Sequence, residues 1–272
     1  MTQPQGSPLA VPLPWDLVSS AYSEEVVPLF EAFSREALRL AGVPAGSRIV
    51  DVACGPGTLS VLAAQAGCAV DAIDFSPQMI EKLSARIGSL PITARLGDGQ
   101  ALPYPDATFD AGFSMFGLMF FPDRAKGFAE LRRVLRPGAK AVVSSWPPFD
   151  NIPACAAMMG AIRETMGKAM GTPPPPDRPS PLTTVEECRA EMSVSFADVE
   201  VHEFATTQRT ESADALWESF TRTMAPVALM KKSLGDKFAA VDAAAREAIR
   251  GAIGKGPAEQ TLKAHLTVGT AR

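Results

Sequence analysis

Strand-like and helix-like segments alternate along the middle of the chain, and this alternation limits the folds that the sequence can adopt. Helical periodicity appears at residues 57–66, 77–87 and 123–135. Five apolar runs around these helices have the length and β-branched content of strands: RIVDVAC, AVDAIDF, ITARLGD, FDAGFSM and AKAVVSSW. Strands joined by helices of this length pair in parallel and are buried on both faces. The sequence therefore predicts an α/β fold with a doubly wound, Rossmann-like and mostly parallel sheet.

The flanking regions extend this core to seven strands and add helices. Residues 16–40 have helical spacing and are expected to divide at Pro28. After the fifth strand, residues 152–170 and 183–192 are helical, the second with a capping box of Thr183 and Glu186. VEVHEF is the sixth strand and KAHLTVGTAR the last. Residues 211–253, with breaks near Pro226 and Gly235, predict a helical lid inserted before that last strand.

This pattern predicts a division of the chain into three parts. Residues 1–14 are polar and rich in proline and are expected to be disordered. Residues 15–210 together with residues 260–272 form the main domain, and residues 211–259 form the lid over the substrate site. The stretch GTPPPPDRPSP, residues 171–181, is expected to be an extended spacer within the main domain.

Composition excludes several classes of partner. The chain has 272 residues and a formal net charge of −4, which is unlike the basic surface that binds nucleic acid. The N-terminus lacks the features of a signal peptide, and the most apolar stretch, Phe113 to Phe121, is too short to cross a bilayer. Four scattered cysteines and two distant histidines predict no metal site and suit a reducing cytoplasm. We therefore expect a cytoplasmic protein with a small-molecule partner and no membrane partner; the oligomeric state, a homodimer included, stays open.

The glycine-rich stretch DVACGPGTLS, residues 51–60, follows the first strand of the core. Ligands of open α/β sheets bind at the carboxyl ends of the strands, where this turn is expected to lie. From Gly55 the turn reads G-P-G-T-L-S, so it lacks the third glycine of a dinucleotide-binding loop, and Pro56 removes an N–H that a pyrophosphate would use. It is not a P-loop because no Gly-Lys-Ser/Thr follows. The turn alone leaves the ligand class open.

Carboxylates at the ends of the next two strands narrow this choice. Asp74 lies 17 residues after Gly57, where an acidic residue can accept hydrogen bonds from a ribose diol. A solvated aspartate at a strand end is the alternative. Asp98, within GDGQ, is placed to accept a hydrogen bond from the exocyclic amine of adenine. Together they favour a ligand that contains adenosine.

The stretches DVACGPG, AIDFSPQMI, GDGQALPYPDATFD, FPD and LRRVLRPGAKAV occur in one order between about Arg48 and Trp146. In these stretches the chain resembles the class I S-adenosylmethionine-dependent methyltransferases, most closely the methyltransferase type 11 branch that includes the ubiquinone- and menaquinone-biosynthesis enzymes. The resemblance covers roughly half of the chain. It departs from the family pattern in two places: Ala53 replaces a glycine, and Met119 and Phe120 stand where many relatives have a histidine.

The resemblance implies S-adenosyl-L-methionine as the cofactor and S-adenosyl-L-homocysteine as its product. Asp51 and the turn of Ala53, Cys54, Gly55 and Gly57 would face the methionine part of the cofactor, with Ser114 and Met115 on the same side. Asp74 would bind the ribose hydroxyls. The adenine would lie near Phe75, Met79 and Asp98, with Gly99 or Gln100 adding a backbone N–H. Tyr22 would close over the cofactor.

The expected reaction is transfer of a methyl group to a small, aromatic or lipophilic acceptor by SN2 displacement. Alignment of the reactants and exclusion of water supply most of the catalysis in such a displacement. We name no catalytic residue, because His202 and His265 lie inside expected strands and neither Tyr22 nor Glu218 is supported as a base. An apolar substrate pocket, or else plain core packing, is expected for Trp15, Phe116, Met119, Phe120, Trp146, Trp217 and Met224.

Two other functions stay open at this point. The first is a non-catalytic protein of the same fold that binds S-adenosylmethionine without turnover. The second is an NAD-dependent dehydrogenase, which the missing third glycine and the GDGQALP stretch disfavour. The acceptor, the choice among oxygen, nitrogen and carbon as nucleophile, and the regiochemistry cannot be derived from the residues.

Overall fold

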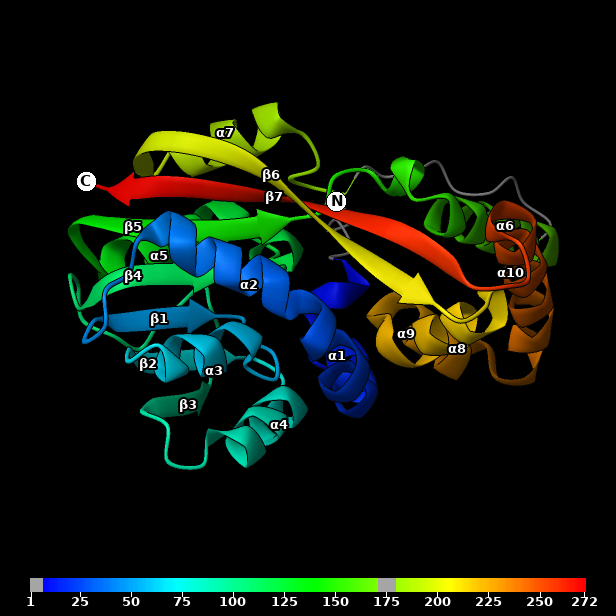
Figure 1. The fold of residues 1–272 in the computed structure, drawn as a ribbon, viewed down its shortest axis with the longest axis horizontal. Coiled ribbons are helices and arrows are strands. Elements are labelled where there is room, and N and C mark those ends of the chain that lie inside the picture. The colour runs from blue at the N-terminus through cyan, green and yellow to red at the C-terminus, as the bar shows by residue number, and fades with distance from the viewer. Residues whose placement is uncertain (1–6, 171–179) are drawn as a thin grey trace, which may run out of the picture.

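The protein is built on one seven-stranded sheet in the order β3-β2-β1-β4-β5-β7-β6, as Figure 1 shows. The computed structural model describes residues 7–170 and 180–272. The strands from β1 to β5 pair in parallel, whereas β7 runs antiparallel to both β5 and β6. Their bounds are β1 Arg48–Val52, β2 Ala69–Asp74, β3 Ile92–Leu96, β4 Phe109–Ser114, β5 Leu135–Ser145, β6 Phe196–Thr210 and β7 Ala258–Ala271. The predicted doubly wound, mostly parallel fold is confirmed.

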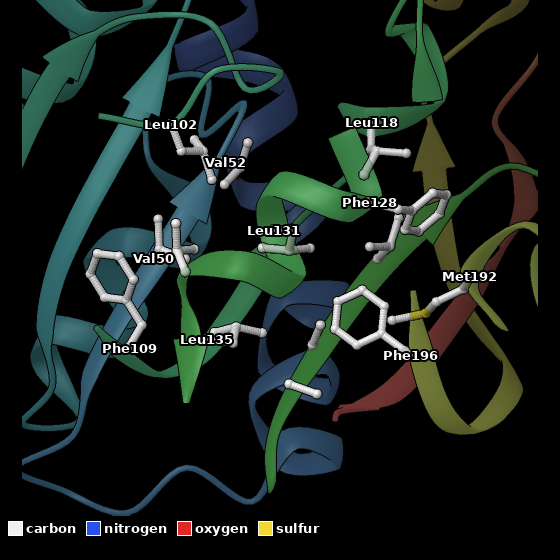
Figure 2. Packing of buried hydrophobic residues seen from close by; sticks show 14 of the residues in the cluster. Val50, Val52, Leu102, Phe109, Leu118, Phe128, Leu131, Leu135, Met192 and Phe196 are labelled. Atoms are coloured by element: carbon white, nitrogen blue, oxygen red, sulfur yellow. The ribbon is translucent and has the colours of Figure 1, made fainter. Parts of the chain in front are cut away.

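Helices cover both faces of the sheet (Figure 1). One face packs on α2 (Val27–Ala41), α3 (Thr58–Gln65) and α4 (Pro77–Ile87), and the other on α5 (Arg124–Val134) and α7 (Val185–Ser193). Figure 2 shows the second interface, where Phe128 and Leu131 of α5 and Met192 of α7 meet Val50 and Phe196 of the sheet. The sheet is therefore buried on both sides, as its apolar strands require.

Local signals account for the ends of these helices. Ser76 caps α4, its hydroxyl accepting from the Met79 N–H at 3.1 Å, and Pro77 occupies the first turn as predicted. The capping box of α7 differs from the expected one by a residue, because Thr184 and Glu187 form it. Thr183 instead lies before the cap, where its N–H and hydroxyl both donate to the Glu187 carboxylate.

The N-terminal region is ordered further than the sequence predicts. Residues 1–6 lie outside the described part of the chain, but Pro8–Ala10 forms a 3₁₀ turn and α1 already begins at Leu13. The Trp15 indole N–H donates to the Leu9 carbonyl at 2.9 Å and ties the turn to the helix. The expectation of disorder through residue 14 is therefore wrong for residues 8–14. The expected division at Pro28 takes the form of a π-helical turn, Tyr22–Val26, between α1 (Leu13–Ala21) and α2.

The region before the last strand forms a helical unit beside the sheet (Figure 1). It contains α8 (Ala213–Thr223), α9 (Ala225–Leu234) and α10 (Phe238–Ile253). The breaks fall at Met224, two residues before Pro226, and at Gly235, near the predicted positions. A further helix, α6 (Pro153–Met170), packs Ala154, Met158 and Ile162 into the same apolar cluster. The helical unit is therefore larger than residues 211–259.

Strands β6 and β7 are longer than predicted and reach from the sheet to this helical unit (Figure 1). The sequence predicts only VEVHEF and KAHLTVGTAR because the outer halves of both strands are polar and lack strict alternation. Pairing explains the extension, since Thr210 lies opposite Ala258 at the far end of the ladder. Most of the predicted spacer, residues 171–181, lies outside the described residues. Within the described ranges, no helix combines the length and the apolar character needed to cross a membrane.

Candidate functional site

A cavity of about 260 Å³ lies at the carboxyl ends of β1, β2, β3 and β4. This is the edge at which doubly wound sheets bind ligands. The cavity brings together residues from four of the five stretches that carry the resemblance, all except LRRVLRPGAKAV. Of the residues predicted to bind a cofactor, those that line it are Tyr22, Asp51, Ala53, Cys54, Gly55, Asp74, Phe75, Met79, Asp98, Gly99, Gln100 and Met115.

The glycine-rich turn has a left-handed backbone at three positions. The φ angles are +56° at Ala53, +53° at Gly55 and +79° at Gly57. Glycine suits such angles because it has no Cβ. A Cβ on Gly57 would also lie 2.2 Å from the Leu83 Cδ1 of α4. Ala53 adopts the same left-handed region at a steric cost, because it carries a Cβ.

Asp74 ties the turn to the end of β2. Its carboxylate accepts from the Gly55 N–H at 2.8 Å and from the Ser76 N–H at 2.9 Å. Burial raises the pKa of Asp74 to about 6, against the backbone hydrogen bonds that favour the charged form. The Asp74 side chain therefore fixes the glycine-rich turn in addition to lining the cavity. The sequence did not indicate this structural role.

Asp51 lies at the floor of the cavity with one oxygen unpaired. Its Oδ2 accepts from the Ser60 hydroxyl at 2.6 Å, while the buried Oδ1 has no hydrogen-bond partner among the described residues. Burial raises the pKa of Asp51 to about 7, and the nearby charge of Asp74 adds to the rise. A buried carboxylate oxygen without a partner is costly unless a ligand pairs with it.

The end of β3 forms a third wall, at Asp98, Gly99 and Gln100. The Gln100 backbone N–H donates to Asp98 Oδ1 at 2.8 Å, and its side-chain oxygen accepts from the Asp123 N–H at 2.9 Å. A Cβ on Gly99 would lie 2.4 Å from the Phe121 ring. Glycine at this position therefore allows Phe121 to pack beside the cavity.

Aromatic side chains also line the cavity, and together they are its aromatic wall. Predicted members Trp15, Phe116 and Phe120 line the cavity, and Phe30 and Phe121 join them. The Trp15 and Phe120 ring centroids are 5.1 Å apart. Phe116 has a φ of +56°, and its N–H donates to the Ser144 hydroxyl at 2.8 Å, which supports that strained backbone. Tyr22 also lies on this wall, where burial, followed by the charge of Asp74, raises the pKa of its hydroxyl well above the ordinary value.

Six predicted site residues do not line the cavity. Gly57 packs against α4, and the buried Ser114 hydroxyl accepts from the Leu118 N–H at 3.1 Å. Trp146 stacks behind Phe116 at a centroid distance of 4.1 Å. Core packing, the alternative interpretation, holds for the other three: Met119 lies in the main core, while Trp217 and Met224 pack within the helical unit.

The sequence did not indicate several residues that line the cavity. They are Leu9, Ala10, Phe30, Ser34, Thr58, Leu59, Ile73, Gly97, Gly117, Phe121 and Pro122. A signal existed for Phe30 and Ser34, which are four residues apart on α2 and therefore share one helix face with Tyr22 nearby. No sequence signal marked Leu9 and Ala10 as cavity residues, because the proline-rich stretch around them shows no periodicity.

The two histidines lie away from the cavity lining. His202 is on β6, and its Nε2 is 3.4 Å from the Glu200 carboxylate. His265 is buried on β7 with its Nε2 3.1 Å from the Thr183 carbonyl oxygen. In the described part of the chain, His, Cys, Asp and Glu side chains nowhere gather in the groups of three that would hold a metal ion.

The cavity residues fit S-adenosylmethionine. The unpaired Oδ1 of Asp51 suits an ammonium group, and Asp74 and Asp98 lie on separate strand ends where a ribose and a purine amine need acceptors. Aromatic rings line the same cavity. The cavity therefore offers charged acceptors for the polar groups of a cofactor and apolar surface for an acceptor.

Comparison with known proteins agrees with this geometry. Residues 50–143 match the family model described as a methyltransferase domain. An uncharacterized protein of Mycobacterium tuberculosis is 39% identical over 108 residues, which is 39% of each chain. The demethylmenaquinone methyltransferase of Thermus thermophilus is 39% identical over 118 residues, 42% of this chain and 54% of that one. The chain thus spans about half or less of the length of these relatives.

Solved structures share the fold over most of the chain. The [4+2]-cyclase SpnF has a TM-score of 0.59 at 16% identity and covers 99% of both chains. A putative methyltransferase from Bacillus halodurans has a TM-score of 0.55 at 16% identity, covering 88% of this chain and 98% of the other. The fold and the cavity define a class I methyltransferase architecture. Residues 50–143 are a methyltransferase domain of the S-adenosylmethionine-dependent kind, and the chain is similar to demethylmenaquinone methyltransferases over part of its length.

Proposed function

We propose that the protein transfers a methyl group from S-adenosylmethionine to a small aromatic or lipophilic acceptor. The observation that carries this proposal is a cavity lined both by three carboxylates and by aromatic rings. The carboxylates suit the cofactor's polar groups, and the rings suit a flat apolar molecule.

Each carboxylate has a proposed partner on the cofactor. Asp51 would pair with the ammonium group through Oδ1, which has no partner among the described residues. Asp74 would accept from the ribose hydroxyls while it keeps its bonds to the Gly55 and Ser76 N–H groups. Asp98 would accept from the adenine amine, with Phe75 and Met79 beside the ring. Bonds of this kind to charged acceptors contribute about 1.5–3 kcal/mol each.

The acceptor would lie against Trp15, Phe30, Phe116 and Phe120. Bound S-adenosylmethionine supplies a methyl group on a positively charged sulfur, which is already an activated leaving group. The protein's part is to align the acceptor with that methyl group and to exclude water by means of the aromatic wall. Because neither histidine lines the cavity in the described structure, proximity is the proposed source of most of the rate.

The relatives named demethylmenaquinone methyltransferase support a more specific acceptor class. The reduced, quinol form of such a ring offers a flat apolar face for stacking and an electron-rich ring carbon or oxygen, which takes the methyl group and releases a proton. The rings that line this cavity suit that shape. We therefore propose a quinone-like or phenolic ring as the acceptor.

The main domain and the helical unit have separate proposed roles. Residues 15–210 and 260–272 would bind the cofactor, and the helices of residues 211–259 would act as a lid on the acceptor side. Contacts of α9 with α1 support this, since Ala225 and Ala228 pack on Val18 and Trp15. Helix α6 belongs with the lid because it shares its apolar core.

A transfer assay tests the proposal. The protein is incubated with S-adenosylmethionine labelled in its methyl group and a panel of quinols, phenols and aromatic amines. Label in the acceptor, together with S-adenosylhomocysteine, is the expected result, and Asp74→Ala is the inactive control. Binding of the cofactor without transfer to any acceptor would favour a non-catalytic binding protein. Conversion of an acceptor without gain of a methyl group would point instead to a rearrangement on the same fold.

A further inference from the structure

The π-helical turn Tyr22–Val26 joins the cavity to the helical unit. The Val27 N–H donates to the Tyr22 carbonyl five residues back, so the turn holds one residue more than an α-helical turn. Turns of this kind are rare and often occur at functional sites. Here the extra residue lets one short segment present Tyr22 to the cavity and Glu25 to α8.

Glu25 makes several bonds to one face of α8. Its Oε2 accepts from the Ser219 hydroxyl at 2.6 Å, and its Oε1 accepts from the Arg222 Nε at 2.9 Å. Ser219 and Arg222 are three residues apart and therefore neighbours on the helix. Burial alone would raise the pKa of Glu25, but the hydrogen bonds from Arg222 and Ser219 favour the charged form, and the pKa is lowered overall.

Helix α8 is in turn fixed within the helical unit. The indole N–H of the fully buried Trp217 donates to Asp242 of α10 at 2.8 Å. Arg250 of α10 donates to both carboxylate oxygens of Asp214 at 2.8 Å. A displacement of α8 would therefore move α10 with it, and Glu25 is bonded to the whole unit rather than to one loose helix.

We propose that Glu25 is a positioning residue: its bonds to Ser219 and Arg222 hold the helical unit against the π-turn and so keep Tyr22 over the cavity. This inference rests on the proposed function, since it takes the cavity to be the cofactor site. It makes cofactor affinity depend on a residue that does not line the cavity. Tyr22 transmits the effect because it belongs to the same turn.

A double-mutant cycle between Glu25 and Tyr22 tests this coupling. The affinity for S-adenosylhomocysteine is measured by calorimetry for Glu25→Ala, Tyr22→Ala and the double variant. Glu25→Ala is expected to weaken binding about fivefold, which lies within the range of interaction free energies between coupled residues. When Tyr22 is already replaced, Glu25→Ala is expected to cause no further loss of affinity. Independent, additive effects of the two substitutions would overturn the proposal.

Two further variants separate positioning from a general loss of stability. The charge swap Glu25→Arg with Arg222→Glu is expected to recover most of the lost affinity, because the pair is restored with reversed signs. Glu31→Ala is the matched control, since Glu31 pairs with Arg35 on the exposed side of α2. An equal loss of affinity in Glu31→Ala would mean that any ion pair near α2 has the same effect and would refute the assignment.

Hydrogen exchange without ligand separates this inference from the proposed function. Glu25→Ala is expected to speed amide exchange in residues 18–27 and in residues 213–223 together, with Glu31→Ala unchanged. If the wild type fails to bind S-adenosylhomocysteine, the proposed function fails, and the exchange result still decides whether Glu25 couples the two segments. Faster exchange in one segment alone, or in neither, would overturn the coupling.

Discussion

Replacing Asp51 by asparagine is expected to remove a large part of the pH dependence of stability. The folded protein holds the pKa of Asp51 near 7 because the side chain is buried. An unfolded aspartate has a pKa of about 3.9. Between these values the folded chain binds more protons than the unfolded chain, so the free energy of unfolding falls as the pH rises.

The size of the effect follows from the shift. A difference of about three pH units corresponds to roughly 4 kcal/mol once Asp51 is fully charged. Roughly 2–3 kcal/mol of this is lost between about pH 5 and about pH 8. The pKa of Asp74 is also raised, to about 6. Its ionisation therefore also lowers the free energy of unfolding as the pH rises, and this contribution remains in Asp51→Asn. The variant should therefore keep a shallower slope rather than none.

Urea unfolding, followed by tryptophan fluorescence at several pH values, measures this slope. Ser60→Ala is the companion variant: it removes the hydroxyl that donates to Asp51 at 2.6 Å, so the pKa of Asp51 should rise further and the loss should extend to higher pH. Asp51→Asn should also weaken S-adenosylhomocysteine binding. Equal slopes in the wild type and Asp51→Asn would refute the assignment of a buried carboxyl group with a raised pKa to the cavity floor.

Three further substitutions test other parts of the site. Asp74→Ala should weaken S-adenosylmethionine binding about tenfold to a hundredfold in calorimetry, from the loss of charged hydrogen bonds; unchanged affinity would remove the ribose assignment. Trp217→Ala should cost about 3–5 kcal/mol in urea unfolding because a fully buried ring is deleted, and a loss below 1 kcal/mol would contradict its place in the helical core. Gly99→Ala should lower stability by about 1–3 kcal/mol, since its Cβ meets Phe121, and full stability would show that the ring moves freely.

The sheet and the carboxylate side of the cavity were predictable because their signals are local. Alternating strands and helices fix the parallel order, and the carboxyl ends of β1, β2 and β3 then meet at one edge. Asp51, Asp74 and Asp98 each follow from a position at or just after a strand end. What the sequence could not show is that Asp74 also braces the glycine turn through the Gly55 N–H.

The aromatic side was predicted less well because tertiary packing decides it. Trp15 and Trp217 look alike in sequence, each in an amphipathic helix, yet one lines the cavity and the other fills the helical core. The same holds for Phe120 and Met119, which are adjacent in sequence: Phe120 lines the cavity, whereas Met119 lies in the main core. Helix α6 shares a core with α10 across a long stretch of chain, and no local pattern marks such a contact.

The most direct test of the central claim is a calorimetric titration of the purified protein with S-adenosylmethionine, S-adenosylhomocysteine and NADH. The account predicts that the first two bind and that NADH does not. The cavity offers carboxylates to an ammonium, a ribose and an adenine, whereas its glycine-rich turn lacks a third glycine and Pro56 has no N–H for a pyrophosphate. Binding of NADH alone, or of none of the three, would contradict it.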